Sequence, residues 1–94
     1  MAYMVIRHKV KDYDAWKVGF DNAIDIRKAG GEKSFRIFQL VDDRNDVVAI
    51  FEWDSLDNAK KFVDSPELRE AMEKAGVSEE PKVNFLEEVA QGTT

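Results

Sequence analysis

The chain of 94 residues contains no cysteine and only one histidine, His8. The absence of cysteine excludes disulfide bonds, a thiolate nucleophile, iron–sulfur clusters and cysteine-ligated zinc. One histidine is too few for a metal site built on a histidine pair. Fourteen basic residues stand against nineteen acidic ones, which gives a formal net charge of −5 with His8 neutral. This balance excludes a protein that binds nucleic acid through a concentrated basic patch.

Long hydrophobic runs are also missing. No apolar stretch approaches the roughly 20 residues that a membrane-spanning helix needs, and the first residues place a short apolar run ahead of the charges, the reverse of a secretory signal. We therefore expect a cytoplasmic protein that makes no contact with membranes. Apolar residues make up 44% of the chain, close to the usual globular share. We expect one domain over residues 1–90, followed by a frayed tail at 91–94.

The hydrophobic pattern predicts a definite order of elements. Apolar and β-branched runs predict strands at 2–10, 33–41, 47–53 and 82–89. Apolar residues at spacings of three and four predict helices at 13–29 and 56–63 and a third helix that starts at Pro66. The order β-α-β-β-α-α-β is the ferredoxin-like plan, an α+β fold. Right-handed crossovers place the helices on one face of a four-stranded antiparallel sheet.

Polar residues and glycines predict where these elements begin and end. An aspartate in the segment 12–14 is available as the N-cap of the first helix, and Ser55 as the N-cap of the second. Gly30-Gly31 ends the first helix, because glycine adopts the left-handed conformation without steric cost. The polar run 42–46 predicts a five-residue hairpin loop in which Asn45 or its neighbour Asp46 takes a positive φ.

Both faces of the predicted sheet carry apolar residues. The strand at 47–53 directs Val47, Ala49, Phe51 and Trp53 to one side, and Val48 and Ile50 to the other. Helices can cover only one side, and the bare side would form a patch at or above the largest one usual on a monomer. We therefore expect a homodimer in which the bare sheet faces pack together. The alternative is a monomer with scattered exposed apolar residues.

Four segments of the chain carry a resemblance to known proteins: HKVKDYDAWK at 8–17, IRKAGG at 26–31, FEWDSLDNAK at 51–60 and SPELREAM at 65–72. With these segments the chain resembles the dimeric α+β barrel superfamily, and within it the small proteins related to antibiotic-biosynthesis monooxygenases. The resemblance covers nearly the whole chain and is specific for the fold rather than for the chemistry. It implies that two sheets form a barrel and that each protomer holds a pocket between sheet and helices.

The resemblance implies several kinds of chemistry. Some relatives oxidise electron-rich aromatic molecules with dioxygen and no cofactor, and others catalyse isomerisations or ring closures. Relatives that degrade haem use an axial histidine on a helix, whereas His8 lies on a predicted strand. We therefore expect a cofactor-independent monooxygenase, or a related proton-transfer enzyme, that acts on a small apolar or aromatic molecule and uses neither cofactor nor metal. The alternative is a non-catalytic dimer that binds a ligand or serves a structural role.

Two polar residues are candidates for catalysis. His8 belongs to the same alternating set as Ile6 and Val10, so it should face an apolar side, either as a proton-transfer group or as a hydrogen-bonded core histidine. Arg27 continues the helical stripe that contains Phe20 and Ile24. Its guanidinium would stabilise a developing oxyanion, or its stem would cover apolar surface while its head reaches water.

Four aromatic residues are candidates for binding the substrate, because pockets for small planar ligands are lined mostly by such side chains. They are Trp16, Phe20, Phe51 and Trp53. The alternative is that these residues form ordinary core, since aromatic side chains at helical or strand spacing usually do.

Overall fold

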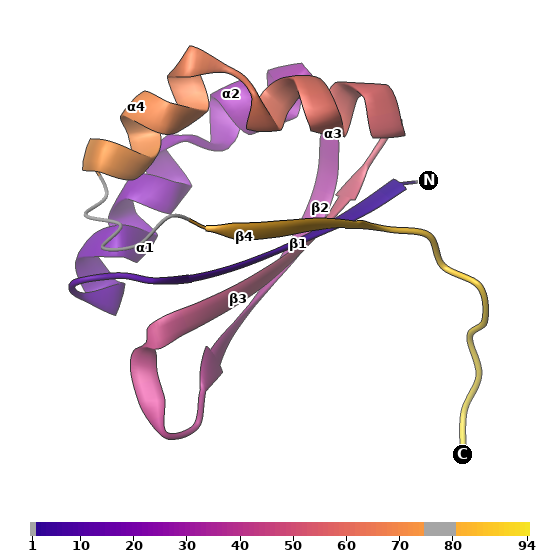
Figure 1. Cartoon of the computed structure of the whole chain (residues 1–94), viewed down its shortest axis with the longest axis horizontal. Coiled ribbons are helices and arrows are strands. Elements are labelled where there is room, and N and C mark those ends of the chain that lie inside the picture. The colour runs from indigo at the N-terminus through magenta and orange to yellow at the C-terminus, as the bar shows by residue number, and fades with distance from the viewer. Residues whose placement is uncertain (1, 75–80) are drawn as a thin grey trace.

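The computed structural model describes residues 2–74 and 81–94 and has the expected α+β, ferredoxin-like fold (Figure 1). Its elements, in chain order, are β1 (Ala2–Lys9), α1 (Tyr13–Asn22), α2 (Ile24–Gly30), β2 (Glu32–Leu40), β3 (Asp43–Trp53), α3 (Leu56–Val63), α4 (Pro66–Lys74) and β4 (Lys82–Leu86). Among the helices described within these two ranges, none is both long enough and apolar enough to cross a bilayer.

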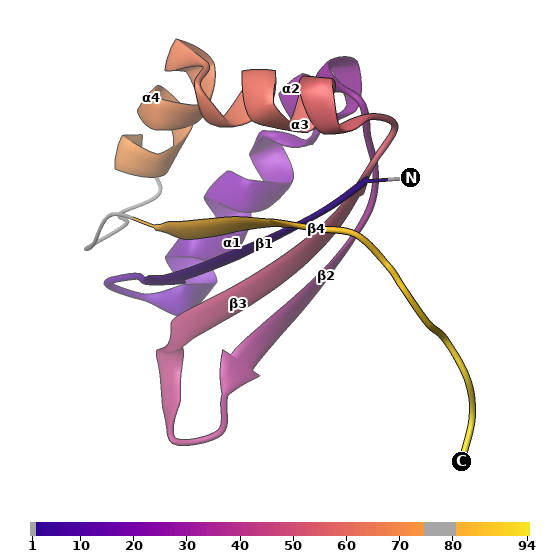
Figure 2. The same ribbon diagram turned by 45° about the vertical axis from the view of Figure 1, so that its right-hand side comes forward.

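The four strands form one antiparallel sheet in the order β2-β3-β1-β4. The central strand β1 places Ile6 opposite Ala49 of β3 and opposite Val83 of β4. The four described helices lie on one side of the sheet, and residues 2–74 and 81–94 leave the other side bare (Figures 1 and 2). The expected number of strands, their pairing and the one-sided helical layer are therefore confirmed.

The prediction of a single helix at 13–29 is wrong, because the structure divides this segment into α1 and α2 at Ala23. The Asp12 side chain caps α1 as expected, accepting from the Ala15 amide at 3.1 Å. At the division, the Ala23 amide bonds to the carbonyls of Gly19 and Phe20, and the Phe20 carbonyl also accepts from the Arg27 side chain. A helix carbonyl bonded by a side chain is a common cause of an interruption.

The prediction of a five-residue hairpin loop at 42–46 is also wrong. Strand β3 begins at Asp43, so the turn is confined to residues 41 and 42, and no described residue other than glycine has a positive φ. Tertiary contacts fix the polar residues of this run as strand. The Asn45 side chain accepts from the Tyr13 amide at 2.9 Å, and the Asn45 carbonyl accepts from the Val10 amide at 2.8 Å.

The last strand ends at Leu86 and not at residue 89. Beyond it, residues 87–94 have no regular secondary structure and are exposed, with Val89 91% accessible. This segment extends away from the sheet on its bare side (Figure 2). The strand prediction failed because the pairing of β4 with β1 ends at Leu86, and Val89 has no partner strand among the described residues, although its residue type suits a strand.

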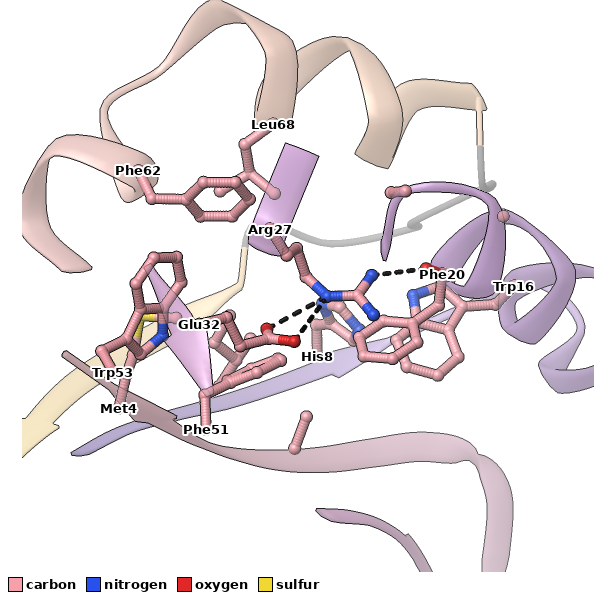
Figure 3. Close-up of a pocket in the computed structure, with 14 residues that line it drawn as sticks. Met4, His8, Trp16, Phe20, Arg27, Glu32, Phe51, Trp53, Phe62 and Leu68 are labelled. Carbon is pink, nitrogen blue, oxygen red and sulfur yellow. Dashed lines mark hydrogen bonds and ion pairs between the residues drawn. The ribbon is translucent and has the colours of Figure 1, made fainter. Parts of the chain in front are cut away.

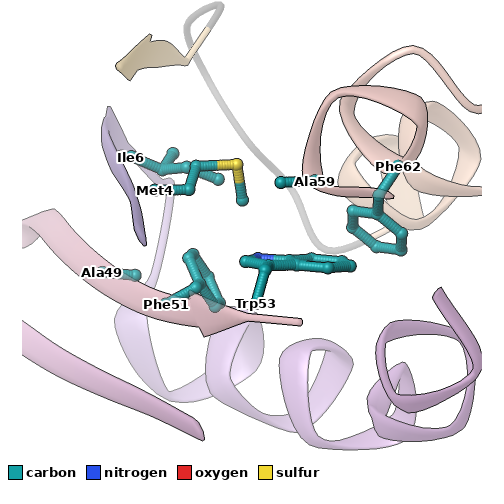
Figure 4. Packing of buried hydrophobic residues seen from close by; sticks show 7 residues of the cluster. All are labelled: Met4, Ile6, Ala49, Phe51, Trp53, Ala59 and Phe62. Carbon is teal, nitrogen blue, oxygen red and sulfur yellow. The ribbon is translucent and has the colours of Figure 1, made fainter. Parts of the chain in front are cut away.

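The core lies between the sheet and the helices. Seven buried residues from β1, β3 and α3 form its larger cluster (Figure 4): Met4, Ile6, Ala49, Phe51, Trp53, Ala59 and Phe62. A smaller cluster joins Trp16 of α1 to Val10 and Val47. Ile24, expected on the same helical stripe as Arg27, is exposed because α2 starts with a new orientation after Ala23. The helical layer thus covers one set of strand residues and leaves the alternate set uncovered.

Candidate functional site

A cavity of about 60 Å³ lies between the sheet and the helices (Figure 3). Its walls come from β1, β2 and β3 below and from α1, α2, α3 and α4 above. All six candidate residues from the sequence line it, namely His8, Trp16, Phe20, Arg27, Phe51 and Trp53. The fold therefore brings together residues that are up to 45 positions apart (53 − 8 = 45).

Arg27 enters this cavity from α2 and is only 4% exposed. Its Nε lies 3.0 Å from Oε1 of Glu32 and donates to Oε2 at 3.1 Å. Its Nη1 donates to the Phe20 carbonyl, and its guanidinium carbon lies 3.7 Å from the centroid of the Phe20 ring. The alternative in which the guanidinium reaches water is therefore wrong. A buried guanidinium held by a carboxylate and an aromatic face is fixed in position.

Glu32 is the functional candidate that sequence reasoning missed. It is the first residue of β2, and its side chain is 5% exposed. Burial raises the pKa of Glu32, and the neighbouring Arg27 opposes this shift only in part. Among nineteen acidic residues a single glutamate gives no signal of its own. The available signal was its position, five residues after Arg27 and directly after the Gly30-Gly31 helix end.

The backbone at Gly31 explains how Arg27 and Glu32 meet. Gly31 has φ 120°, which glycine adopts readily, and a Cβ at this position would collide with the Asp54 carboxylate. The Asp54 amide also donates to the Gly31 carbonyl at 2.9 Å. This tight turn reverses the chain between the end of α2 and the start of β2, so that the two charged side chains point into the same cavity.

His8 reaches the cavity from β1 and is 8% exposed, so the expected apolar environment is confirmed. Its ring meets the Trp16 ring edge-on, with centroids 5.4 Å apart. Burial lowers the pKa of His8 below its ordinary value of 6.5, although the charge of Asp46 works in the opposite direction. Asp46 itself forms an ion pair with Arg7 at 3.0 Å. His8 is therefore neutral at pH 7 and able to accept or donate a hydrogen bond.

The aromatic candidates form a continuous wall around the cavity. The Phe20 ring lies 5.1 Å from Trp16 and 6.1 Å from Phe51, measured between centroids. On the other side, Trp53 is fully buried and packs on Phe62 at 5.1 Å. Most of the surface presented to a ligand is therefore apolar and flat.

Four buried polar side-chain atoms have no hydrogen-bond partner within residues 2–74 and 81–94, and all four belong to cavity residues. They are Nδ1 of His8, Nη2 of Arg27, Oε1 of Glu32 and Nε1 of Trp53. An unpaired buried polar atom costs about 1–3 kcal/mol, and such atoms are rare in folded proteins. Two of the four are obligatory donors, and the ionised carboxylate oxygen is an acceptor. The cavity can therefore hold a molecule that offers both an acceptor and a donor.

No cluster of three or more histidine, cysteine, aspartate or glutamate side chains suited to a metal ion occurs in the part of the chain that the structure describes.

Comparison with known proteins gives matches only at the level of structure. No protein-family model matches the sequence, and no curated protein matches it. A Bordetella bronchiseptica protein described as a candidate antibiotic biosynthesis monooxygenase superposes with a TM-score of 0.81 at 15% identity, over 95% of this chain and 97% of the other. This chain has the antibiotic biosynthesis monooxygenase fold.

Two further structures with this fold extend the comparison. SnoaB, described as a cofactor-independent oxygenase from Streptomyces nogalater, superposes with a TM-score of 0.74 at 16% identity, over 98% of this chain and 94% of the other. A candidate antibiotic biosynthesis monooxygenase from Nitrosomonas europaea gives 0.71 at 17% identity, over 96% and 100%. At these identities the monooxygenase fold is shared, whereas substrate and activity have to be argued from the residues of this chain.

Proposed function

We propose that this protein binds a small apolar or aromatic molecule between its sheet and its helices and oxidises it with dioxygen without a cofactor. The observation that carries the proposal is the set of four buried polar atoms, from His8, Arg27, Glu32 and Trp53, that have no hydrogen bond within the described residues and lie around one aromatic cavity. A ligand that meets these atoms would supply the missing hydrogen bonds. The shared fold with a described cofactor-independent oxygenase supports the choice of reaction.

The residues have separate roles in this proposal. Trp16, Phe20, Phe51 and Trp53 hold the flat apolar body of the substrate. The Arg27 guanidinium stabilises negative charge that develops on a substrate oxygen, and His8 is a candidate for proton transfer. The electrons come from the substrate itself, so that one atom of dioxygen enters the product and the other leaves as water. Since proton removal makes an aromatic molecule easier to oxidise, these residues would promote the reaction.

A second candidate function is non-catalytic ligand binding by a dimer. The observation that favours it is the size of the cavity, about 60 Å³, because pockets for drug-sized ligands have volumes of about 300–1,000 Å³. A protein that only binds a very small molecule needs no more space than this. An enzyme acting on a larger aromatic substrate has to open the cavity, most directly by moving Phe62 and Leu68, which cover it from the side of α3 and α4 (Figure 3).

The proposal includes a homodimer formed through the bare face of the sheet. Apolar side chains follow one another across this face: Val5 pairs with Ile50, and Phe38 pairs with Val48. Phe38 and Leu86 are 43% and 44% exposed. A second copy of the chain would bury these side chains in a two-fold contact. The exposed segment 87–94 projects on the same side and would add to the contact.

Ligand binding can be tested by intrinsic fluorescence, because the only two tryptophans of the chain, Trp16 and Trp53, both line the cavity. A panel of small aromatic molecules should quench or shift this emission in a saturable way. The variant Ala49→Leu, which fills the cavity from β3, should weaken binding at least tenfold. The exposed substitution Val18→Leu on α1 is the matched control and should leave binding unchanged. Equal affinity in Ala49→Leu would refute the cavity as the binding site.

Oxidation is tested with the ligands found in this way. Uptake of dioxygen that depends on both protein and ligand, with one labelled oxygen atom in the product, is the expected result. Saturable binding without any uptake of dioxygen would instead select the non-catalytic function.

A further inference from the structure

The ion pair between Arg27 and Glu32 differs from an ordinary surface ion pair. Both side chains are 5% exposed, and both line the cavity. Yet, among the described residues, Nη2 of the guanidinium has no hydrogen-bond partner, and Oε1 of the carboxylate accepts no hydrogen bond although it lies 3.0 Å from Nε in the ion pair. A pair that served only to hold α2 against β2 would be expected to satisfy both groups fully. The missing hydrogen bonds of Nη2 and Oε1 therefore indicate that a group of a bound ligand contacts both atoms from within the cavity.

The charge of the pair restricts what this third group can be. The positive charge of Arg27 is already compensated by Glu32, so the pair is neutral as a whole. A ligand that stays anionic beside an ionised Glu32 would bring an uncompensated charge into an apolar space, which is costly. A neutral ligand with a hydroxyl group carries no such cost, because its O–H can donate to Oε1 while its oxygen accepts from Nη2.

We propose that Glu32 is the proton acceptor of this site and that Arg27 changes its ionic partner during the transfer. This inference rests on the proposed function, since it assigns a role in the same cavity. The O–H bond of the ligand breaks, its electron pair stays on the ligand oxygen, and the proton forms a new O–H bond on Glu32. Arg27 Nη2 then donates to the ligand oxyanion. No group is oxidised or reduced in this step, and the net charge of the cavity does not change.

Glu32 is better suited to this step than His8. Among the described residues, three ionisable side chains line the cavity, namely His8, Arg27 and Glu32. Protonation of His8 would place a second positive charge near Arg27 in an apolar space, and burial already lowers the pKa of His8. Protonation of Glu32 removes a buried charge instead, in the direction in which burial shifts its pKa. His8 remains available as a neutral hydrogen-bond partner for the ligand.

The test measures protons and not turnover. The probe is para-nitrophenol at a pH above its own pKa, where the free probe is an anion, and binding is measured by calorimetry in two buffers with different heats of ionisation. Wild-type protein should take up about one proton for each probe molecule bound, because the anion can be accommodated only when Glu32 is protonated. The variant Glu32→Gln should bind the probe with no proton uptake. Glu73→Gln, at an exposed position of α4, is the control and should behave as wild type.

An infrared measurement on wild-type protein keeps the proposal testable even if Glu32→Gln does not fold. Addition of the probe should produce a protonated-carboxyl band that shifts when the glutamates are labelled with ¹³C. Probe binding without this band, or the same proton uptake in folded Glu32→Gln as in wild type, would overturn the assignment of Glu32 and leave the cavity as a binding site. Failure of wild-type protein to bind any aromatic probe would overturn the proposed function and this inference together.

Discussion

The two faces of the sheet are built from alternate residues of the same strands but present different chemistry. The face beneath the helices carries the buried aromatic residues Phe51 and Trp53 together with His8, and the Arg27–Glu32 pair reaches it from one end. The opposite face carries Val48 and Ile50 and lacks a covering layer within the described chain. One face therefore has polar atoms that lack hydrogen bonds, and the other has apolar area that no described segment covers.

This difference separates two kinds of recognition. Unpaired polar atoms inside a cavity select a small molecule with matching donors and acceptors, because each unmatched atom costs free energy. An open apolar face selects a large complementary surface, because its driving force grows with the area removed from water. The proposed function accordingly places ligand binding on one side of the sheet and self-association on the other. Substitutions on the two sides should have separable effects.

The largest effect is expected on the covered face. Trp53 is completely buried and contacts both the cavity and Phe62. The substitution Trp53→Ala should lower the free energy of unfolding by about 3–5 kcal/mol, the usual cost of removing a large buried aromatic side chain. Urea denaturation measures this change. Ile24→Ala, at an exposed position of α2, is the comparison and should cost far less. Equal losses for the two variants would contradict the assignment of Trp53 to the core.

An intermediate effect is expected on the bare face, where the substitution Ile50→Lys should abolish the dimer and preserve the fold of each chain. The introduced charge would have to be buried against the second copy, whereas in the monomer it points to water. Light scattering should give about twice 10.8 kDa for wild type and about 10.8 kDa for the variant, with an unchanged circular dichroism spectrum. Val18→Lys, on an exposed part of α1, should remain dimeric. A monomeric wild-type protein at micromolar concentration would remove the dimer from the proposal.

The smallest effect concerns the protonation of His8. Burial lowers the pKa of His8 below 6.5, so at mildly acidic pH the unfolded chain binds more protons at this residue than the folded chain does. The contribution of His8 to stability should therefore be greatest above pH 6.5 and should fall as the pH decreases through this value towards the pKa of His8 in the folded protein. Urea denaturation at a series of pH values should show this loss in wild type and a flatter profile in His8→Gln. The same slope in both proteins would place the titrating group elsewhere.

Much of the fold could be predicted from hydrophobic periodicity, because alternation along the strands and the helical spacing around Trp16 and Phe20 are strong local signals. The predictions failed where tertiary contacts decide the structure. Ala23 interrupts the helix because a side chain from the next turn bonds the Phe20 carbonyl. Asn45 lies in a strand because it bonds the backbone amides of Val10 and Tyr13, which are distant from it in sequence. No local pattern contains such contacts.

The candidate site shows the same division. The burial of His8 followed from the strand face on which it lies, whereas the sequence left open whether the Arg27 guanidinium is buried and whether the aromatic residues line a cavity or form ordinary core. Glu32 was missed because its importance comes from burial beside Arg27, whereas its residue type is the commonest sign of an exposed position. The sequence identified Arg27 as a candidate but did not identify Glu32 as its ionic partner.

Because the chain turns sharply at Gly31, the charged residues of the site are close together in sequence, and its apolar residues are not. Both members of the charged pair come from one continuous hexapeptide, 27–32, whereas the apolar walls are assembled from segments that are distant in sequence. Under the proposed function, substitutions in the walls would alter the size and shape of the molecule that fits, whereas the charged pair that acts on its hydroxyl group would stay within this hexapeptide.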